Sequence, residues 1–273
     1  MSIEEGYFES RDGKRLFYRF QRGTGPEKPV FILHGHGEHS GRYLKFFSRL
    51  AGHEYPVAAF DLRGCGRSDG PPVYVSSFQD YLNDLTDYRR FLEAKGWVRG
   101  PLQLLGHSLG GLIAVFWARQ NPAEVSKLVL SSPLFGLPLS GFLRALTHAL
   151  NAVMPHYVIY NPVKPPFLTH DPEEVRKYKT DPLIRRRITV RLAHEMLKCI
   201  SLLRQEALTF PFPVYVLMAG DDYVVDPEAT KRLFHRLQAP RKELKVFEGL
   251  YHEIFNEKEQ DKVFEIFRAY LRE

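Results

Sequence analysis

The sequence predicts an α/β fold in which a mostly parallel sheet carries helices on both faces. Short, nearly continuous apolar runs alternate with longer stretches of helical periodicity, which is the pattern of parallel strands buried on both faces. One of these runs leads through Gly-His-Ser-Leu-Gly directly into a helical pattern. The chain has 273 residues, of which 44% are hydrophobic and 26% charged, enough to bury one large core.

The predicted elements follow one another in a regular order. GYFES and KRLFYRF form a hairpin around the turn residues Arg11-Asp12-Gly13. The buried strands are expected at Val30–Leu33, Val57–Phe60, Leu102–Leu105, Lys127–Ser131, Val214–Ala219 and Leu244–Glu248. The helices are expected at Arg42–Ala51, Ser77–Lys95, Leu109–Gln120, Pro227–Gln238 and Glu257–Arg272. This alternation predicts a doubly wound sheet.

One interval breaks the alternation. Residues 133–210 hold helical and proline-rich stretches but no clear strand. We interpret them as a helical cap inserted into a core made of residues 1–132 and 211–273. The interval has eleven Lys and Arg against six Asp and Glu, so it supplies most of the net charge of +6.

A helix with one apolar stripe is predicted within the cap. Leu139–Val153 has Ser140 as a reasonable N-cap. Its apolar side chains share one helical face, which holds Phe142, Leu143, Leu146, Leu150 and Val153. Ordinary helix packing would explain this stripe. The alternatives are a helix that binds an acyl chain and one that docks on an interface, where the positive cap favours an anionic lipid surface.

Several features of the sequence bear on where in the cell the protein is located. The start MSIEEGYFES has neither a basic nor an apolar region, so we expect no signal peptide. The apolar runs are too short to span a bilayer, and two cysteines give no disulfide framework. We therefore expect a cytoplasmic protein, with peripheral membrane contact through the cap as the open alternative. We expect no nucleic-acid partner, and the sequence leaves the oligomeric state open.

The stretch Leu102–Gly111, LQLLGHSLGG, is the most specific motif in the chain. It places Gly-x-Ser-x-Gly between a strand and a helix, which is the setting of a nucleophile elbow. The turn is so tight that glycine is needed on both sides of Ser108. Ser108 would then lie at the N-terminus of a helix, whose unpaired N–H groups can stabilise an oxyanion. The alternative is a glycine-rich connection with a buried serine.

A serine nucleophile needs a base, and the base needs a carboxylate that orients it. His252 follows the last predicted strand and precedes the last helix, so it is the strongest candidate base. Three candidate acids follow the preceding strand, namely Asp221, Asp222 and Asp226. The chain order of Ser108, then one of these acids, then His252 is the order expected for this fold class.

The stretch from His34 to Tyr43, HGHGEHSGRY, permits a different interpretation. His34, His36, Glu38 and His39 have the spacing of ligands in binuclear metallohydrolases, and zinc prefers such ligands. Such a site would need further ligands from later strands, and this interpretation leaves GHSLGG unexplained. A metallohydrolase therefore stays an alternative.

Five stretches in one order resemble a known family. HGHGEHSGRY, DLRGCGRSDGP, GHSLGG, GDDYVVDP and YHEIFNE resemble the monoacylglycerol lipases and bacterial lysophospholipases of the α/β-hydrolase superfamily. The resemblance covers nearly the whole chain and is weaker in the cap. It implies that Asp222 is the acid, with Asp226 as second choice, and that neither a metal nor an organic cofactor is needed.

The same resemblance assigns a function to the first histidine stretch. It implies an oxyanion hole formed by the backbone N–H groups of His36 and Leu109. Many relatives have a small residue at the position of His36. The resemblance also implies that Glu38, Arg42 and His107 line the polar end where a glycerol head group lies. For these three side chains a surface ion pair is the alternative interpretation.

The function expected from these features is that of a serine ester hydrolase. Ser108, Asp222 and His252 would act through an acyl-enzyme on a single-chain lipid ester, either a monoacylglycerol or a lysophospholipid. A short-chain carboxylesterase or an acyltransferase would use the same triad. A catalytically idle hydrolase fold that only binds a ligand is the alternative of another class, and such proteins usually lack a triad member.

Overall fold

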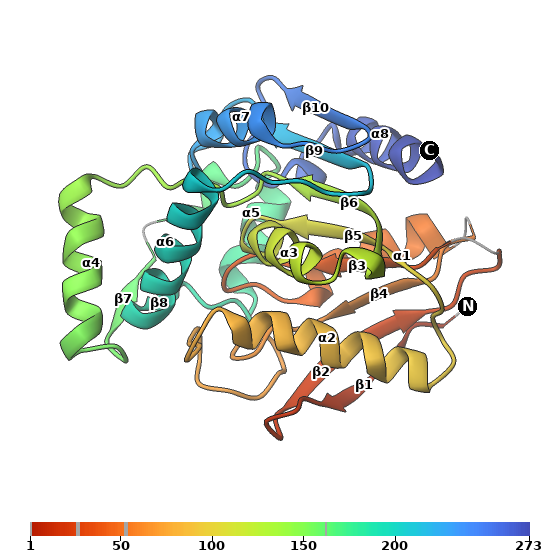
Figure 1. Ribbon diagram of the computed structural model, residues 1–273, viewed down its shortest axis with the longest axis horizontal. Helices are drawn as coiled ribbons and strands as arrows, with labels where there is room; N and C mark the ends of the chain where they lie inside the picture. The colour runs from red at the N-terminus through yellow and green to blue at the C-terminus, as the bar shows by residue number, and fades with distance from the viewer. Residues whose placement is uncertain (1, 26–27, 52–53, 162) are drawn as a thin grey trace.

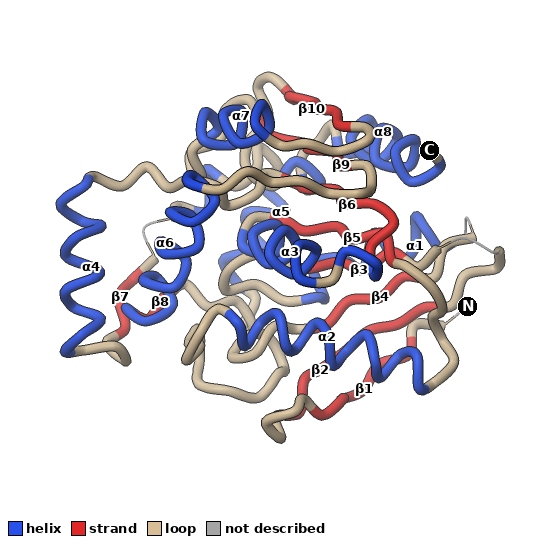
Figure 2. Tube along the Cα trace, viewed as in Figure 1, coloured by secondary structure: helices blue, strands red, loops and turns tan. Residues whose placement is uncertain are grey.

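The computed structural model describes residues 2–25, 28–51, 54–161 and 163–273. Its main feature is an eight-stranded sheet with the order β1-β2-β4-β3-β5-β6-β9-β10 (Figures 1 and 2). The strands are β1 Glu4–Glu9, β2 Arg15–Gln21, β3 Val30–Leu33, β4 Val57–Phe60, β5 Leu102–His107, β6 Val125–Ser131, β9 Val214–Ala219 and β10 Lys242–Phe247. β1 and β2 form the predicted hairpin, and β2 pairs antiparallel with β4. All other neighbours in this sheet are parallel, which confirms the predicted fold class.

Helices cover both faces of the sheet. They are α1 Leu44–Ala51, α2 Gln79–Ala94, α3 Leu109–Gln120, α4 Gly141–Val153, α5 Pro172–Thr180, α6 Val190–Gln205, α7 Pro227–Arg236 and α8 Gln260–Arg272. Three predicted helices, α1, α2 and α8, begin two or three residues later than expected, and short 3₁₀ turns, Ser40–Tyr43 and Ile254–Asn256, precede α1 and α8. Among the helices of the described residues, none is both long enough and apolar enough to cross a membrane.

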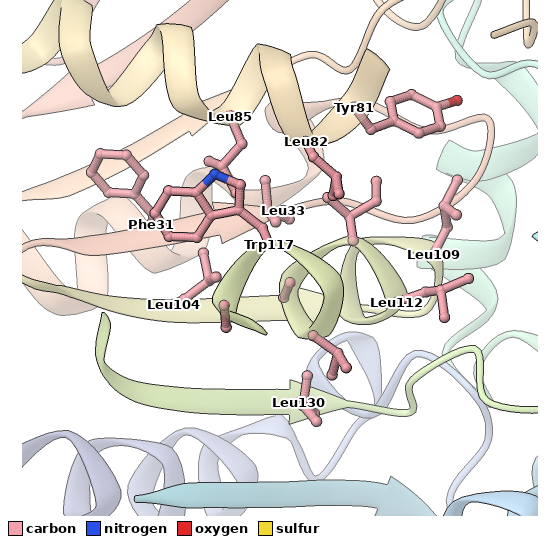
Figure 3. Close-up of a cluster of buried hydrophobic side chains, with 14 of the residues drawn as sticks. Phe31, Leu33, Tyr81, Leu82, Leu85, Leu104, Leu109, Leu112, Trp117 and Leu130 are labelled. Carbon is pink, nitrogen blue, oxygen red and sulfur yellow. The ribbon is translucent and has the colours of Figure 1, made fainter. Parts of the chain in front are cut away.

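The hydrophobic core has two parts, one on each face of the sheet. On one face, buried side chains of α2, α3 and α6 pack against the strands. Figure 3 shows part of this cluster, with Trp117 of α3 near Phe31 and Leu104. On the other face α1 and α8 contribute Phe46, Phe264 and other aromatic side chains. These two layers fix the strand ends, on which the candidate site is built.

The order of the strands creates a crevice at the centre of the sheet. The chain passes from β3 to β4 on one side and then returns to β5 on the other side of β3. Loops that follow two such strands diverge, and ligands of open α/β sheets bind in this place. Leu33 of β3 pairs with Gly106 of β5, so the histidine-rich loop and the serine turn leave the sheet side by side.

The segment between β6 and β9 is inserted at the carboxyl ends of the strands. It contains α4, α5 and α6, and that it forms a separate cap stays a prediction. The expectation that it has no strand was wrong: β7 Val158–Tyr160 and β8 Arg187–Thr189 pair antiparallel. Each has only three residues, too few for a recognisable alternation. We call residues 132–213 the inserted segment.

Candidate active site

Ser108 lies in the turn between β5 and α3, in a conformation that few residues adopt. Its φ is 53° and its ψ is −117°, and positive φ is unfavourable for a residue with a Cβ. Both flanking glycines are required by close approach of the backbone. A Cβ on Gly106 would lie 2.5 Å from the carbonyl oxygen of Gly110, and one on Gly110 would collide with the carbonyl oxygen of Leu33. The surrounding backbone therefore holds the serine in its strained turn.

The turn places Ser108 among backbone N–H groups. Ser108 is the N-cap residue of α3, and Leu109 is the first residue of that helix. The first N–H groups of a helix have no partner within it, and their dipoles favour negative charge. The loop after β3 lies beside the serine, because a Cβ on Gly35 would be 3.3 Å from the Cβ of Ser108. His36, the second residue predicted to donate to an oxyanion, directly follows Gly35.

His252 and Asp222 meet at the ends of β9 and β10. His252 Nδ1 lies 2.7 Å from Asp222 Oδ2, and their side chains are only 3% and 2% exposed. The N–H groups of Val224 and Val225 donate to the other carboxylate oxygen, over 2.8 and 3.0 Å. With Nδ1–H donated to the carboxylate, the neutral ring has its lone pair on Nε2, as a general base requires.

Asp226, the second choice for the acid, has another partner. Its carboxylate caps α7 by accepting from the N–H of Ala229, and it forms an ion pair with Arg232. The structure thus brings Asp222, and not Asp226, to the imidazole of His252.

The pKa of His252 is raised from its ordinary value by its carboxylate partner. Burial disfavours its charged form, but the charge of Asp222 and its hydrogen bond outweigh burial, so the pKa of His252 is raised from 6.5. Burial also raises the pKa of Asp222, and the proximity of His252 more than offsets this, so that pKa is lowered overall. The pair therefore favours a charged imidazole beside a carboxylate, the state that proton transfer from a serine creates.

This pKa shift predicts a pH profile. Only neutral His252 can accept a proton, so kcat/KM should fall as the pH drops through the pKa of this residue. Because that pKa is raised, half of the activity should be lost at a pH above 6.5. The check is kcat/KM from pH 5 to 9 with an uncharged ester as substrate. An acid limb centred below pH 6 would contradict the assignment of His252 as the base.

His107 directly precedes Ser108 in the chain, and its side chain lies close to His252. Its ring centroid is 4.8 Å from that of His252, and its Nδ1 lies 3.2 Å from Ser131 Oγ. Burial and the nearby His252 lower the pKa of His107 to about 4. At neutral pH His107 therefore adds a polar but uncharged ring beside the candidate triad.

Glu38 and Arg42 form a buried network that supports the loop after β3. The Arg42 guanidinium donates to Glu38 over 2.9 Å, and to both carboxylate oxygens of Glu253 over 2.6 and 2.7 Å. Glu38 also accepts from the Tyr43 hydroxyl and from the N–H of Gly35. Arg42 is too deeply placed for a surface ion pair, with its side chain 8% exposed. The network connects this loop to the loop that carries His252.

The space beside this network is small. A hollow of about 20 Å³ is lined by Glu38, Arg42, Tyr43, Phe46, His107, Ser131, Glu253, Phe255 and Asn256. That volume holds about one water molecule. Contact of Glu38 or Arg42 with a substrate head group stays a prediction.

The three histidines that suggested a metal site point to separate partners. His34 Nδ1 faces the carbonyl oxygen of Gly35, and its Nε2 accepts from the N–H of Leu62. His39 Nε2 contacts Asp181, and His36 Nε2 contacts the carbonyl oxygen of Arg187. Within the described ranges, no three or more His, Cys, Asp or Glu side chains converge as metal ligands would. The metallohydrolase interpretation therefore lacks the ligand set that it predicts.

Glu257 is a further residue of the site that sequence analysis did not identify. Its buried carboxylate accepts from the N–H groups of Tyr251 and His170, the Thr169 hydroxyl and the His170 ring, over 2.8 to 3.1 Å. The N–H of Glu253 also donates to the carbonyl oxygen of Leu168. Glu253 is thus bound to the inserted segment directly, and Tyr251, the other neighbour of His252, is connected to it through Glu257. The only signal in the sequence was a glutamate five residues after the histidine.

Comparison with known proteins identifies relatives over most of the chain. Phospholipase YtpA of Bacillus subtilis is 32% identical over 90% of this chain and 95% of its own. Monoglyceride lipase of Homo sapiens is 33% identical over 90% of this chain and 82% of its own. A match to the uncharacterized protein YnbC of Escherichia coli covers 98% of this chain but 46% of that longer protein.

Solved structures and a family model support the same relationship. The crystal structure of Paleococcus ferrophilus monoacylglycerol lipase is 30% identical and has a TM-score of 0.84, with 99% of this chain and 98% of that one covered. The family model described as serine aminopeptidase, S33 matches residues 24–259. The sheet, the serine turn and these matches together show that the chain belongs to this serine hydrolase family of the α/β-hydrolase superfamily.

Proposed function

We propose that this protein hydrolyses esters of single-chain lipids through Ser108, His252 and Asp222. The proposal is supported by a strained serine at a helix N-terminus and by a buried His252–Asp222 pair, with the ring of His107, the residue before Ser108, 4.8 Å from that of His252. Relatives named monoglyceride lipase and phospholipase support a lipid ester as the substrate class. We favour a monoacylglycerol, because relatives with such names occur among both the sequences and the solved structures.

The proposed reaction proceeds in two halves. Ser108 Oγ bonds to the carbonyl carbon while its proton passes to Nε2 of His252. The resulting oxyanion accepts hydrogen bonds from the N–H groups of His36 and Leu109, each contributing about 3 kcal/mol. Collapse of this intermediate breaks the ester bond, and the alcohol leaves with the proton from His252. Water then attacks the acyl-enzyme with His252 again as base, which releases the acid and restores the serine.

The proposed head-group position is next to His107. Its uncharged ring lies beside the imidazole that protonates the leaving alcohol. Glu38 and Arg42 line the same small hollow as His107, which has room for about one water. A bridging water would extend their hydrogen bonds to a glycerol hydroxyl.

The test compares 1-oleoylglycerol with 1-oleoyl-lysophosphatidylcholine, using Ser108→Ala as the blank. We expect the monoacylglycerol to be cleaved at least about tenfold faster, because the compact pocket at the alcohol side disfavours a charged choline head group. Preference for the lysophospholipid would overturn the head-group assignment. If neither is cleaved above the blank but a short activated ester is, the lipid substrate class is wrong and the triad remains.

We also propose that the inserted segment contacts a lipid surface through α4. None of the residues of α4 is buried, and Phe142 and Val153 are each 74% exposed. Ser140 caps the helix as predicted, by accepting from the N–H of Leu143. Figure 1 shows α4 at the left edge of the molecule, beyond α6. An exposed apolar stripe on a positively charged segment fits an interfacial helix, and it predicts a protein at a membrane surface.

This membrane proposal predicts selective vesicle binding. We expect more protein on anionic than on neutral vesicles at low salt, because eleven basic residues outnumber six acidic ones in the cap region 133–210. The variant Phe142→Ser/Val153→Ser should reduce binding in a sedimentation assay. Tyr7→Ser, a change of an exposed aromatic residue on β1, serves as the control. Equal partitioning to both vesicle types, or equal loss in the control, would contradict the proposal.

A further inference from the structure

We propose that a second site, separate from the triad, binds a fatty acid in its carboxylate form. The site is a hollow of about 600 Å³ between the loop at residues 71–74 and the small sheet of the inserted segment. This volume lies in the range of small-molecule pockets. Ser108, Asp222 and His252 are not among the described residues that line it. We call it the arginine pocket, because Arg185, Arg186 and Arg187 form part of its wall.

One wall of the arginine pocket is a single face of the β7–β8 pair. Tyr160 is opposite Arg187 and Val158 is opposite Thr189 in the register. Alternate residues of a strand point to the same side, so these four side chains share one face, and all four line the pocket. Ile188 is on the other face and packs against the core. The small sheet thus has one face to the pocket, while on its other face Ile188 reaches the core and Ile159 is 39% exposed.

The facing wall is apolar and is held in place. It consists of Pro71, Pro72, Val73 and Tyr74, and Tyr74 stacks on the ring of His156 with centroids 4.6 Å apart. The Thr189 hydroxyl donates to the carbonyl oxygen of Val73 over 2.8 Å, which connects the two walls. Proline, valine and tyrosine surfaces suit an alkyl chain, which gains by leaving water.

Three arginines but no Asp or Glu are among the described residues that line the arginine pocket. Within the described part of the inserted segment, the acidic side chains are engaged elsewhere. Examples are Asp181 with His39, Glu174 with Lys177 and Glu195 with Arg191. Arg185, which lies just before β8, and Arg187, the first residue of β8, both line the pocket. Guanidinium groups bind carboxylates through paired hydrogen bonds, so the charge and the apolar walls together select an alkyl carboxylate.

The arginine pocket is directly attached to the loop that carries His36. The N–H of Arg185 donates to the carbonyl oxygen of Gly37 over 2.7 Å. His36 Nε2 lies 3.0 Å from the carbonyl oxygen of Arg187, and burial lowers the pKa of His36 to about 4. The ring is thus neutral near pH 8 and donates through Nε2. A ligand held by Arg185 and Arg187 would therefore change the surroundings of His36.

The inference that the enzyme itself supplies the fatty acid rests on the proposed function. The inference that the pocket recognises a fatty acid does not. Hydrolysis of a lipid ester releases an alkyl carboxylate, so the reaction itself would supply the occupant. The recognition is argued only from the walls and charges of the pocket. The two proposals can therefore fail separately, and the experiment is arranged to show which one does.

The experiment measures decanoate binding by calorimetry at pH 8, below the concentration at which decanoate forms micelles. The enzyme is first labelled at Ser108 with a long-chain alkyl fluorophosphonate, so that the acyl site of the triad is filled. We expect one saturable site for decanoate, and about tenfold or more weaker binding of decanol, which lacks the charge. Arg185→Gln/Arg187→Gln should weaken decanoate binding by a similar factor. The control Lys177→Gln/Lys179→Gln, which removes two charges from the same segment, should stay within about twofold.

Each contrary result has a definite meaning. Unchanged binding in the Arg185→Gln/Arg187→Gln variant, equal binding of decanol, or no saturable binding would overturn the arginine pocket as a fatty-acid site. Absence of fluorophosphonate labelling would instead count against the triad, and Ser108→Ala would then replace the labelled enzyme. If the arginine variant does not fold, NMR of the labelled protein without substitutions tests where decanoate binds. Decanoate should shift the His36 ring signals and leave those of His235 in place, and saturation without a shift of His36 would overturn the location.

Discussion

Ser108→Ala is expected to lower kcat by roughly 10⁶-fold, while KM changes by less than about threefold. The variant loses the atom that forms the acyl-enzyme but retains the N–H groups of His36 and Leu109, so a small residual rate above that in water should remain. The measurement is steady-state hydrolysis of a monoacylglycerol together with labelling by a fluorophosphonate. Labelling of the variant should be undetectable.

Ser126→Ala provides the matched control for this substitution. Ser126 is on β6, and its hydroxyl donates to the carbonyl oxygen of Leu102 at the far end of the sheet from the candidate site. We expect its kcat to stay within about twofold of the unchanged enzyme. If Ser108→Ala kept most of the activity, the serine mechanism would be excluded. Full loss in Ser126→Ala would show that the assay reports stability instead.

Asp222→Asn is expected to lower kcat by about 10⁴-fold with little change in stability. An amide at this position cannot favour the Nδ1–H tautomer of His252 or stabilise its charged form. Because the Asp222 charge and hydrogen bond raise the pKa of His252, the acid limb of the pH profile should also move to lower pH. This shift separates loss of electrostatic support from simple misfolding, which would lower activity without moving the limb.

Asp226→Asn tests the alternative acid. Asp226 caps α7 and pairs with Arg232, and asparagine is also a good N-cap residue. We therefore expect a change in the free energy of unfolding of less than about 1 kcal/mol and nearly unchanged kcat. A large loss of kcat in this variant, with Asp222→Asn active, would reverse the assignment.

Much of the fold could be predicted from local patterns. Most parallel strands are short apolar runs whose burial on both faces leaves a clear signal, and all six predicted runs overlap observed strands, including the partly exposed edge strand β10. β7 and β8 were missed because three residues do not establish a period, and their pairing joins positions 158–160 to 187–189. Such pairing depends on how the intervening chain folds and not on local composition.

The candidate site, like the fold, has a part that could be predicted from local sequence patterns and a part that could not. Ser108, Asp222 and His252 each follow a strand that is evident in the sequence, so their placement at neighbouring strand ends could be expected. The partners of Arg42 could not. Glu253 is 211 residues further along the chain, and both of its carboxylate oxygens accept from Arg42. A pair separated by this distance leaves no periodic signal, and the same holds for Glu257 and His170.

The four hydrogen bonds accepted by Glu257 limit how this protein can be rebuilt. Segments inserted between two strands of a doubly wound sheet are attractive modules for exchange, because removal leaves the sheet itself continuous. Here Leu168, Thr169 and His170 belong to the inserted segment and bind the residues on both sides of His252, directly or through Glu257. A chimaera that takes its segment from another protein must therefore preserve these contacts as well as the two junctions, since it replaces part of the support of its own general base.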